Sequence, residues 1–218
     1  MISKKKVLIC FTGVDGSGKT THAKHLLRFL QEKGYSSKYV WAASRPIFIY
    51  PFLVITRILG YWKIIKKNAW MDPLEKAPPS IKKKFALLYR FLLFVDFEIL
   101  ALLKVLLPLL FVKVVICDRY VYDLIMELAL SNLHSPSFAK LMLHATPTPK
   151  RTFFTEAPIH VLVQRRPDFT KENMLAKQNI YRKLAKIFGF KIIDTSAQFK
   201  ANQGYIQKEV LFLLEGSR

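Results

Sequence analysis

The stretch from Gly13 to Thr21 has the residue types and spacing needed to bind a polyphosphate. It reads GVDGSGKTT and meets the pattern G-x-x-x-x-G-K-[ST]. Its glycines allow backbone conformations in which successive N–H groups converge on phosphate oxygens. Lys19 would reach the β- and γ-phosphates, and the Thr20 hydroxyl would ligate Mg²⁺. We therefore expect a nucleoside triphosphate with Mg²⁺ to bind at Gly13, Val14, Asp15, Gly16, Ser17, Gly18, Lys19, Thr20 and Thr21.

The residues on either side favour this interpretation over that of a glycine-rich turn without a ligand. The apolar run from Val7 to Phe11 predicts a strand before the loop. After the loop, apolar residues at helical spacing predict a helix that starts near Lys19 and ends near Lys33, with Gly34 as its left-handed cap. The positive N-terminal end of this helix would add to the attraction for phosphate.

Charged residues follow two further predicted strands. Asp118 and Arg119 come directly after the β-branched run KVVIC, Lys113–Cys117, and Arg45 follows a strand at about 38–42. Ligands bind at the carboxyl ends of strands in open α/β sheets. We expect Asp118 to hold the water shell of Mg²⁺, and Arg119 and Arg45 to contact an acceptor phosphate. The alternatives are a structural ion pair for Asp118 and Arg119, and a solvated loop residue for Arg45.

The order of elements predicts an α/β fold with an open, five-stranded parallel sheet and helices on both faces. The remaining strands are expected at 151–155 and 191–194. Helices are expected at about 121–131, 137–144, 156–163, 172–188 and 205–214. A longer helix at 81–107 should stop near Pro108, and its charged residues indicate a buried core helix rather than a membrane span.

Composition limits the classes of partner. The 218 residues fit a single domain, and Cys10 and Cys117 lie in apolar runs, which indicates free thiols in a reducing, cytoplasmic compartment. The net charge of +20 accompanies no nucleic-acid-binding motif, so we expect no specific nucleic acid partner. The apolar segment 47–62 is expected to cover an acceptor pocket or to lie at an interface. Peripheral contact with anionic membranes is a further hypothesis, and a homodimer is left open.

Three motifs in order give the chain a family likeness. FTGVDGSGKTT, CDRYVYDL and QRRPDF, the last followed by a helix with Tyr181 to Ala185, resemble those of thymidylate kinases, which are P-loop nucleoside monophosphate kinases. The likeness follows the element order over nearly the whole chain. It implies a P-loop kinase domain over residues 1–218 that binds ATP and Mg²⁺ through Lys19, Thr20 and Asp118.

The same resemblance implies further roles. Arg119, Arg45 and Tyr120 would contact the acceptor, and Asp15 would lie close to the acceptor's sugar and phosphate. The polar segment 164–171 would form a lid that brings Arg165 or Arg166 to the transferring phosphoryl group, because Gly16 leaves the loop with no cation except Lys19. The alternative is a solvated junction between two helices.

The chain departs from the family pattern at the acceptor base. Phe94 matches a base-stacking phenylalanine, but Glu98 stands where an arginine that reads thymine is expected. We expect transfer of the ATP γ-phosphate to a nucleoside monophosphate, with dTMP giving dTDP as the leading case. A kinase of a lipid-related or sugar-related acceptor and a non-catalytic ATP-binding protein are the alternatives.

Overall fold

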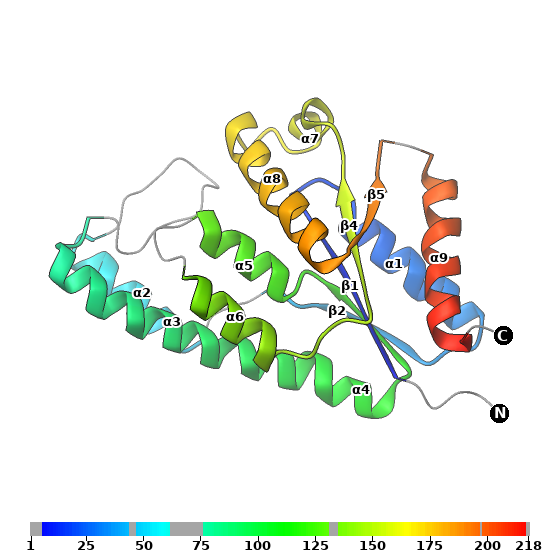
Figure 1. Ribbon diagram of the computed structural model, residues 1–218, viewed down its shortest axis with the longest axis horizontal. Coiled ribbons are helices and arrows are strands. Elements are labelled where there is room, and N and C mark those ends of the chain that lie inside the picture. The colour runs from blue at the N-terminus through cyan, green and yellow to red at the C-terminus, as the bar shows by residue number, and fades with distance from the viewer. Residues whose placement is uncertain (1–5, 44–46, 62–75, 131–134, 197, 217–218) are drawn as a thin grey trace.

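A five-stranded parallel sheet forms the centre of the molecule, which confirms the predicted fold class (Figure 1). The computed structural model describes residues 6–43, 47–61, 76–130, 135–196 and 198–216. The strands lie in the order β2-β3-β1-β4-β5. Their bounds are β1 Val7–Gly13, β2 Ser37–Trp41, β3 Val114–Asp118, β4 Arg151–Glu156 and β5 Lys191–Asp194.

The strand register brings the carboxyl ends of the strands to one edge. Phe11 pairs with Asp118, and Gly13 pairs with Thr155. Trp41 of β2 also pairs with Asp118, on its other side. Because β1 is central and leads into the Gly13–Thr21 loop, residues at the ends of β3 and β4 lie on either side of that loop.

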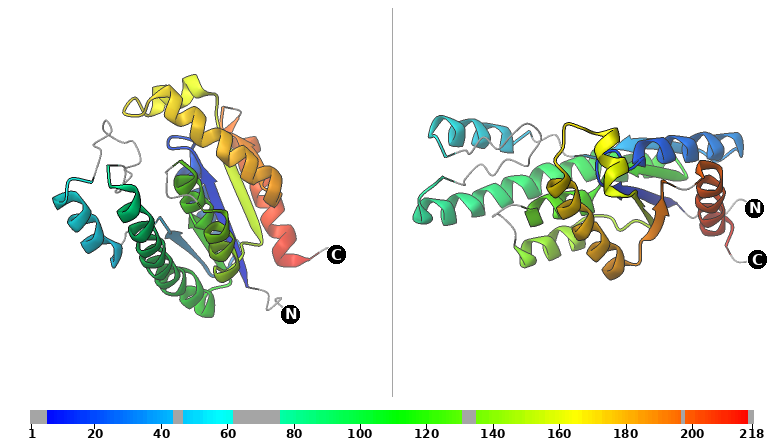
Figure 2. Two further views of the ribbon diagram at one scale, coloured as in Figure 1. Left: turned by 60° about the vertical axis from the view of Figure 1, so that its left-hand side comes forward. Right: turned by 90° about the horizontal axis from the view of Figure 1, so that it is seen from above.

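Helices cover both faces of the sheet (Figure 2). On one face α1 and α9 pack against Val7, Ile9 and Phe11, whereas Leu8 and Cys10 point into the larger apolar cluster on the other face. Cys10 and Cys117 are buried free thiols. The helices are α1 Lys19–Glu32, α2 Ile49–Ile58, α3 Pro79–Ala101, α5 Val121–Leu130, α6 Pro136–Ala145, α7 Ile159–Arg165, α8 Lys171–Phe188 and α9 Phe199–Glu215.

The long helix does not end at Pro108, so that prediction is wrong. After α3 the chain continues through a π-helical turn, η1 Leu102–Leu106, into α4 Leu107–Phe111. The α-helical hydrogen bonds of α3 are interrupted at this wide turn and begin again in α4. Pro108 lies in the first turn of α4, where a backbone N–H has no partner within the helix, so proline is tolerated there. The long helix belongs to the core as predicted, but only through one of its faces, and the other face is exposed. No helix in the described ranges combines the length and apolarity needed to cross a membrane.

Asp96 of α3 fixes the start of α2. Its carboxylate accepts hydrogen bonds from the backbone N–H groups of Ile47, Phe48 and Ile49 at 3.0, 2.9 and 2.9 Å. Asp96 is only 6% exposed. It therefore satisfies N–H groups at the N-terminus of α2 that have no partner within the helix, and it joins α2 to α3.

We expect Asp96→Ala to lower the free energy of unfolding by about 2 kcal/mol, because it leaves these N–H groups without an acceptor. Urea unfolding followed by circular dichroism measures the change. Asp96→Asn is the matched control, since it keeps one side-chain oxygen and should lose less. Equal stability of Asp96→Ala and the parent would contradict this capping role.

Candidate functional site

The Gly13–Thr21 loop lies between β1 and α1. Two of its glycines have no room for a side chain, because β4 and the residue that follows α7 lie close to them. At Gly13 (φ 145°) an added Cβ would lie 2.2 Å from the carbonyl oxygen of Thr155 in β4. At Gly16 (φ 83°) it would lie 2.9 Å from the Cγ atom of Arg166. Both positions have backbone conformations that favour glycine. The loop therefore has the glycine-dependent geometry expected of a phosphate cradle.

Lys19 is folded back over this loop. Its Nζ atom donates hydrogen bonds to the carbonyl oxygens of Gly13 at 2.7 Å and Val14 at 2.9 Å. Burial, reinforced by the charge of Arg119, lowers the Lys19 pKa to about 8. An ammonium group has three donors, so the two carbonyls leave one donor available, and the carboxylates of Asp15, Asp123 and Asp118 offset only part of its loss of solvation. This arrangement suits an anionic ligand at the loop.

Thr20 and Asp118 meet as expected for a magnesium site. The Thr20 hydroxyl donates to Asp118 Oδ2 at 2.5 Å, and the Tyr39 hydroxyl donates to the same oxygen at 2.8 Å. Asp118 Oδ1 is buried and has no hydrogen-bond partner among the described residues. A carboxylate oxygen with a free lone pair beside a hydroxyl fits Mg²⁺, which binds through one or two protein ligands plus water and phosphate.

No group of three or more His, Cys, Asp or Glu residues suited to a metal occurs in the described ranges. The Thr20–Asp118 pair could hold Mg²⁺ together with the phosphates of a nucleotide. Tyr39 was not predicted, because its contact with Asp118 depends on the pairing of β2 with β3.

Arg119 directs its guanidinium group toward the phosphate loop. It has φ 67°, the only positive φ of a non-glycine residue in the described part of the chain. Such a conformation is strained by about 1–3 kcal/mol and needs surrounding contacts to hold it. Arg119 N–H donates to the carbonyl of Phe11 at 3.0 Å, and the guanidinium group forms an ion pair with Asp15 Oδ1. The structure thus brings Asp15 and Arg119 together.

A second cation contacts Asp15 from the opposite side. Lys177 of α8 is 7% exposed, and its Nζ atom lies 3.2 Å from Asp15 Oδ2. Burial alone would raise the Asp15 pKa, but Arg119, Lys19 and Lys177 together lower it well below its usual range. Sequence reasoning missed Lys177. The available signal was its position on the same face of α8 as the buried Tyr181, where a lysine is unusual.

Asp123 is a buried carboxylate next to this cluster of charges. It is buried and accepts hydrogen bonds from the Thr12 hydroxyl at 2.9 Å, the Tyr120 N–H at 3.0 Å and the Tyr181 hydroxyl at 2.7 Å. Its carboxylate also lies 3.8 Å from Arg119. Burial raises the Asp123 pKa, although Arg119 and Lys19 oppose that effect. Asp123 therefore ties β1, α5 and α8 together beneath the ion pairs.

The structure distinguishes the two lid arginines. Arg165, at the end of α7, donates to the carbonyl of Gly16 at 3.2 Å and to the carbonyl of Thr195 at 3.2 Å. Arg166 instead forms two hydrogen bonds with Asp168, at 3.0 and 2.9 Å, and remains exposed. Arg165 thus contacts the phosphate loop directly, whereas Arg166 contacts it only through the close approach of its Cγ atom to Gly16.

Several predicted acceptor residues do not join this cluster. Tyr120 is buried and its ring packs on Phe97 at 5.7 Å, while Phe94 is partly buried in the larger apolar cluster. Glu98 accepts a hydrogen bond from Thr146 at 3.3 Å, and burial raises its pKa. Arg45 lies outside the described residues. The contacts of the described residues therefore place Asp15, Lys19, Thr20, Asp118, Arg119 and Arg165 at one edge of the sheet.

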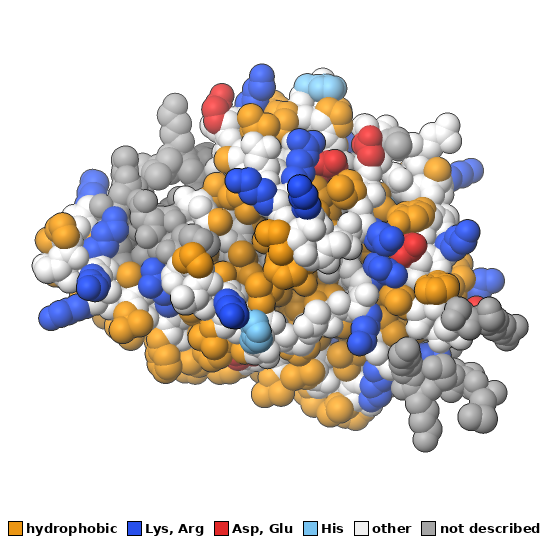
Figure 3. Space-filling model, in the orientation of Figure 1, with side chains coloured by type: hydrophobic (Ala, Val, Ile, Leu, Met, Phe, Trp, Pro, Cys, Tyr) orange, Lys and Arg blue, Asp and Glu red, His pale blue; other side chains and the backbone are white. Residues whose placement is uncertain are grey.

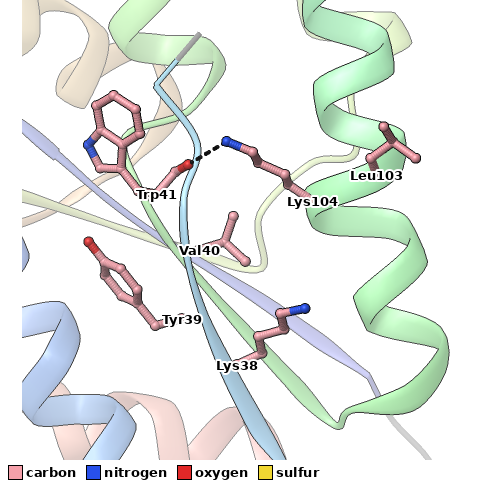
Figure 4. Close-up of a pocket in the computed structure, with 6 residues that line it drawn as sticks. All are labelled: Lys38, Tyr39, Val40, Trp41, Leu103 and Lys104. Atoms are coloured by element: carbon pink, nitrogen blue, oxygen red, sulfur yellow. Dashed lines mark hydrogen bonds between the residues drawn. The ribbon is translucent and has the colours of Figure 1, made fainter. Parts of the chain in front are cut away.

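A surface pocket beside β2 does not include this edge (Figure 4). Lys38, Tyr39, Val40, Trp41, Leu103 and Lys104 line it. Lys104 extends from η1 toward β2 and donates to the carbonyl of Trp41 at 3.2 Å. Two lining residues contact the site described above: the Tyr39 hydroxyl donates to Asp118, and Trp41 pairs with Asp118 in the sheet.

Glu127 of α5 lies within the electrostatic field of the cluster. Its pKa is raised from 4.5 to about 7, chiefly by burial, with Asp123 and Asp15 adding to the shift and Arg119 and Lys177 opposing it. The folded protein therefore binds more protons at this carboxyl than the unfolded chain does between pH 4.5 and 7. Glu127 was also missed by sequence reasoning, since it appears there only as part of a helical pattern.

We expect the free energy of unfolding to fall as the pH rises through this window, because ionised Glu127 is disfavoured in the fold. Glu127→Gln should remove that contribution and stabilise the protein at pH 8 by at least about 1 kcal/mol, with little change at pH 4. Urea unfolding across the pH range measures it. The exposed Glu172→Gln in α8 is the control, and equal pH profiles for the parent and Glu127→Gln would contradict the assignment.

A comparison with models of known protein families finds no match for this chain. The likeness to thymidylate kinases consequently rests on the three motifs. Membership of that family and the identity of the acceptor stay predictions, while the arrangement of the Gly13–Thr21 loop, Asp118 and Arg119 is an observed property of this fold.

Proposed function

We propose that the protein transfers the γ-phosphate of ATP to a nucleoside monophosphate, with dTMP as the first acceptor to test. The observation that carries this proposal is that two groups of positively charged side chains lie next to each other at one edge of the sheet. Lys19 lies on the glycine loop, and Arg119 with Lys177 lies on either side of Asp15. One group suits the phosphates of the donor and the other suits the phosphate of an acceptor.

The residues of the chain divide the work of phosphoryl transfer between positioning and charge stabilisation. Mg²⁺-ATP, when bound, would supply the phosphoryl group and part of the charge neutralisation. The loop amides and Lys19 would hold the phosphates, and Thr20 with Asp118 would hold the metal. Arg119 and Lys177 would exchange Asp15 for the acceptor phosphate, and Arg165 would neutralise charge that develops during transfer.

An acceptor oxygen would form the new bond to phosphorus as the bond from phosphorus to the bridging oxygen breaks, leaving ADP. Two alternatives to a nucleoside monophosphate kinase remain: a kinase with a different acceptor, and a protein that binds ATP but has no acceptor. A lipid-linked or sugar phosphate would use the same two groups of positively charged side chains, and a non-catalytic protein would bind ATP without release of ADP. The buried free thiols Cys10 and Cys117 support a reducing, cytoplasmic location.

The test is an acceptor screen with ATP and Mg²⁺ that measures ADP release and includes nucleoside monophosphates, sugar phosphates and polyprenyl phosphates. With the acceptor found, Lys19→Ala should lower kcat by about 10² or more, because it removes a preorganised charge. Lys177→Met should instead raise KM for the acceptor at least tenfold and leave ATP affinity unchanged.

The exposed Lys33→Ala, at the end of α1, is the matched control for both variants. Near-parental turnover of Lys19→Ala would overturn the phosphate-loop assignment. Equal loss of ATP and acceptor affinity in Lys177→Met would place Lys177 in the scaffold. ATP binding without ADP release for any acceptor would favour the non-catalytic alternative.

Arg165 and Arg166 should differ in effect. We expect Arg165→Ala to lower kcat by about 10², with KM for ATP nearly unchanged, because an arginine that acts on developing charge contributes mainly in the transition state. Arg166→Ala should change kcat less than about threefold, since its guanidinium group is paired with Asp168.

Steady-state rates of both variants, of Arg165→Lys and of the double alanine variant check this expectation. Partial recovery in Arg165→Lys would separate loss of charge from loss of fold. A double variant that keeps kcat within about threefold of the parent falls far short of the effect of an arginine finger and would refute the lid.

A further inference from the structure

One long helical surface is apolar and exposed. Most of the exposed large hydrophobic side chains of the described chain lie on α2, α3, η1 and α4. On α3 to α4 they define the surface that we call the α3–α4 stripe: Leu87, Leu88, Phe91, Leu102, Leu103, Leu106, Leu107, Leu110 and Phe111. Figure 3 shows hydrophobic side chains along the lower edge of the molecule, where Figure 1 draws α3 to α4.

The stripe is continuous. Its members recur every three or four residues, and the partly buried Val95 and Ile99 continue the same side between Phe91 and Leu102. Buried residues such as Leu93, Phe97 and Leu100 occupy the opposite side, against the core. From Leu87 to Phe111 the helical path is on the order of 36 Å long at 1.5 Å per residue. An exposed apolar surface of this extent is unusual for a protein without a partner.

Positive charges lie at both ends of the stripe. Lys83 and Lys84 are exposed at its start. At the other end, the Nζ atom of Lys6 donates to the carbonyl of Leu110 at 2.8 Å, whereas Lys104 turns away from Leu103 toward β2 and donates to Trp41. Within 47–61 and 76–113 the only carboxylates are Asp96, which is buried against the start of α2, and Glu98, which is bonded to Thr146.

We propose that the α3–α4 stripe lies on the surface of an anionic lipid bilayer. An apolar side flanked by lysines is the pattern of helices that rest in the interface, with apolar side chains at the boundary of headgroups and acyl chains. The exposed Lys83 and Lys84 would contact lipid phosphates, each adding to the affinity. A second copy of the chain is a poorer occupant, because a symmetric pairing of this surface would bring lysines together without carboxylates to offset them.

The test is flotation of the full chain with vesicles of phosphatidylcholine alone or mixed with phosphatidylglycerol. We expect binding to the mixed vesicles that weakens as ionic strength rises, and little binding to phosphatidylcholine. Leu106→Glu with Leu110→Glu should weaken partitioning at least tenfold. Lys83→Ser with Lys84→Ser should weaken it about fivefold for each lysine.

Matched controls change the same residue types elsewhere on the surface. Ile187→Glu with Phe212→Glu and Lys183→Ser with Lys186→Ser should float like the parent, and circular dichroism establishes that every variant is folded. Absence of flotation with mixed vesicles at low salt would overturn the proposal. So would equal flotation of the stripe variants and the parent, or a dimer in sedimentation analysis that the Leu106→Glu and Leu110→Glu changes dissociate.

Discussion

The carboxylate of Asp15 is held between two cations from distant parts of the chain, and the site depends on that arrangement. Arg119 follows β3 and Lys177 belongs to α8, yet both contact Asp15 in the loop after β1. Each charge is removed from water, so each needs the others to be tolerable in a partly buried position. The three segments are thereby fixed relative to one another by charge rather than by apolar packing alone.

Asp123, next to this cluster, is a buried carboxylate that is stabilised mainly by hydrogen bonds. Its partners are a hydroxyl from β1, a backbone amide at the start of α5 and a phenol from α8. A buried carboxylate with this many donors is satisfied, and it fixes which side of α5 and α8 faces the sheet edge. Arg119, whose backbone is strained, forms ion pairs through its guanidinium group with both Asp15 and Asp123.

The parts of the fold that the sequence predicts are those governed by local rules. Apolar runs identified five strands, glycines marked the loop and the end of α1, and the loop motif identified Lys19 and Thr20. The register of β3 then brought Asp118 to Thr20, as strand-end placement implied. The helix end predicted at Pro108 was wrong because the effect of this proline depends on the π-helical turn before it, and no residue type predicts such a turn.

Two residues that sequence reasoning missed, Lys177 and Tyr39, act over long separations in the sequence. Lys177 meets a residue 162 positions away, and Tyr39 meets one 79 positions away. Their roles follow from strand order and from the packing of α8, so a local pattern cannot reveal them. The α3–α4 stripe shows a limit of local patterns as well. Helical periodicity predicted the helix, but it could not predict which of the two apolar sides of that helix would face the core.

The close approach at Gly16 restricts how this architecture can acquire positive charge. An added Cβ there would meet the Cγ atom of Arg166, and the Cβ atom of Arg165 would lie 3.5 Å away. A side chain at position 16 would therefore meet the Arg166 side chain, and it would also adopt a strained positive φ. A cation added to the glycine loop at this position would thus compete for space with the arginine-bearing end of α7.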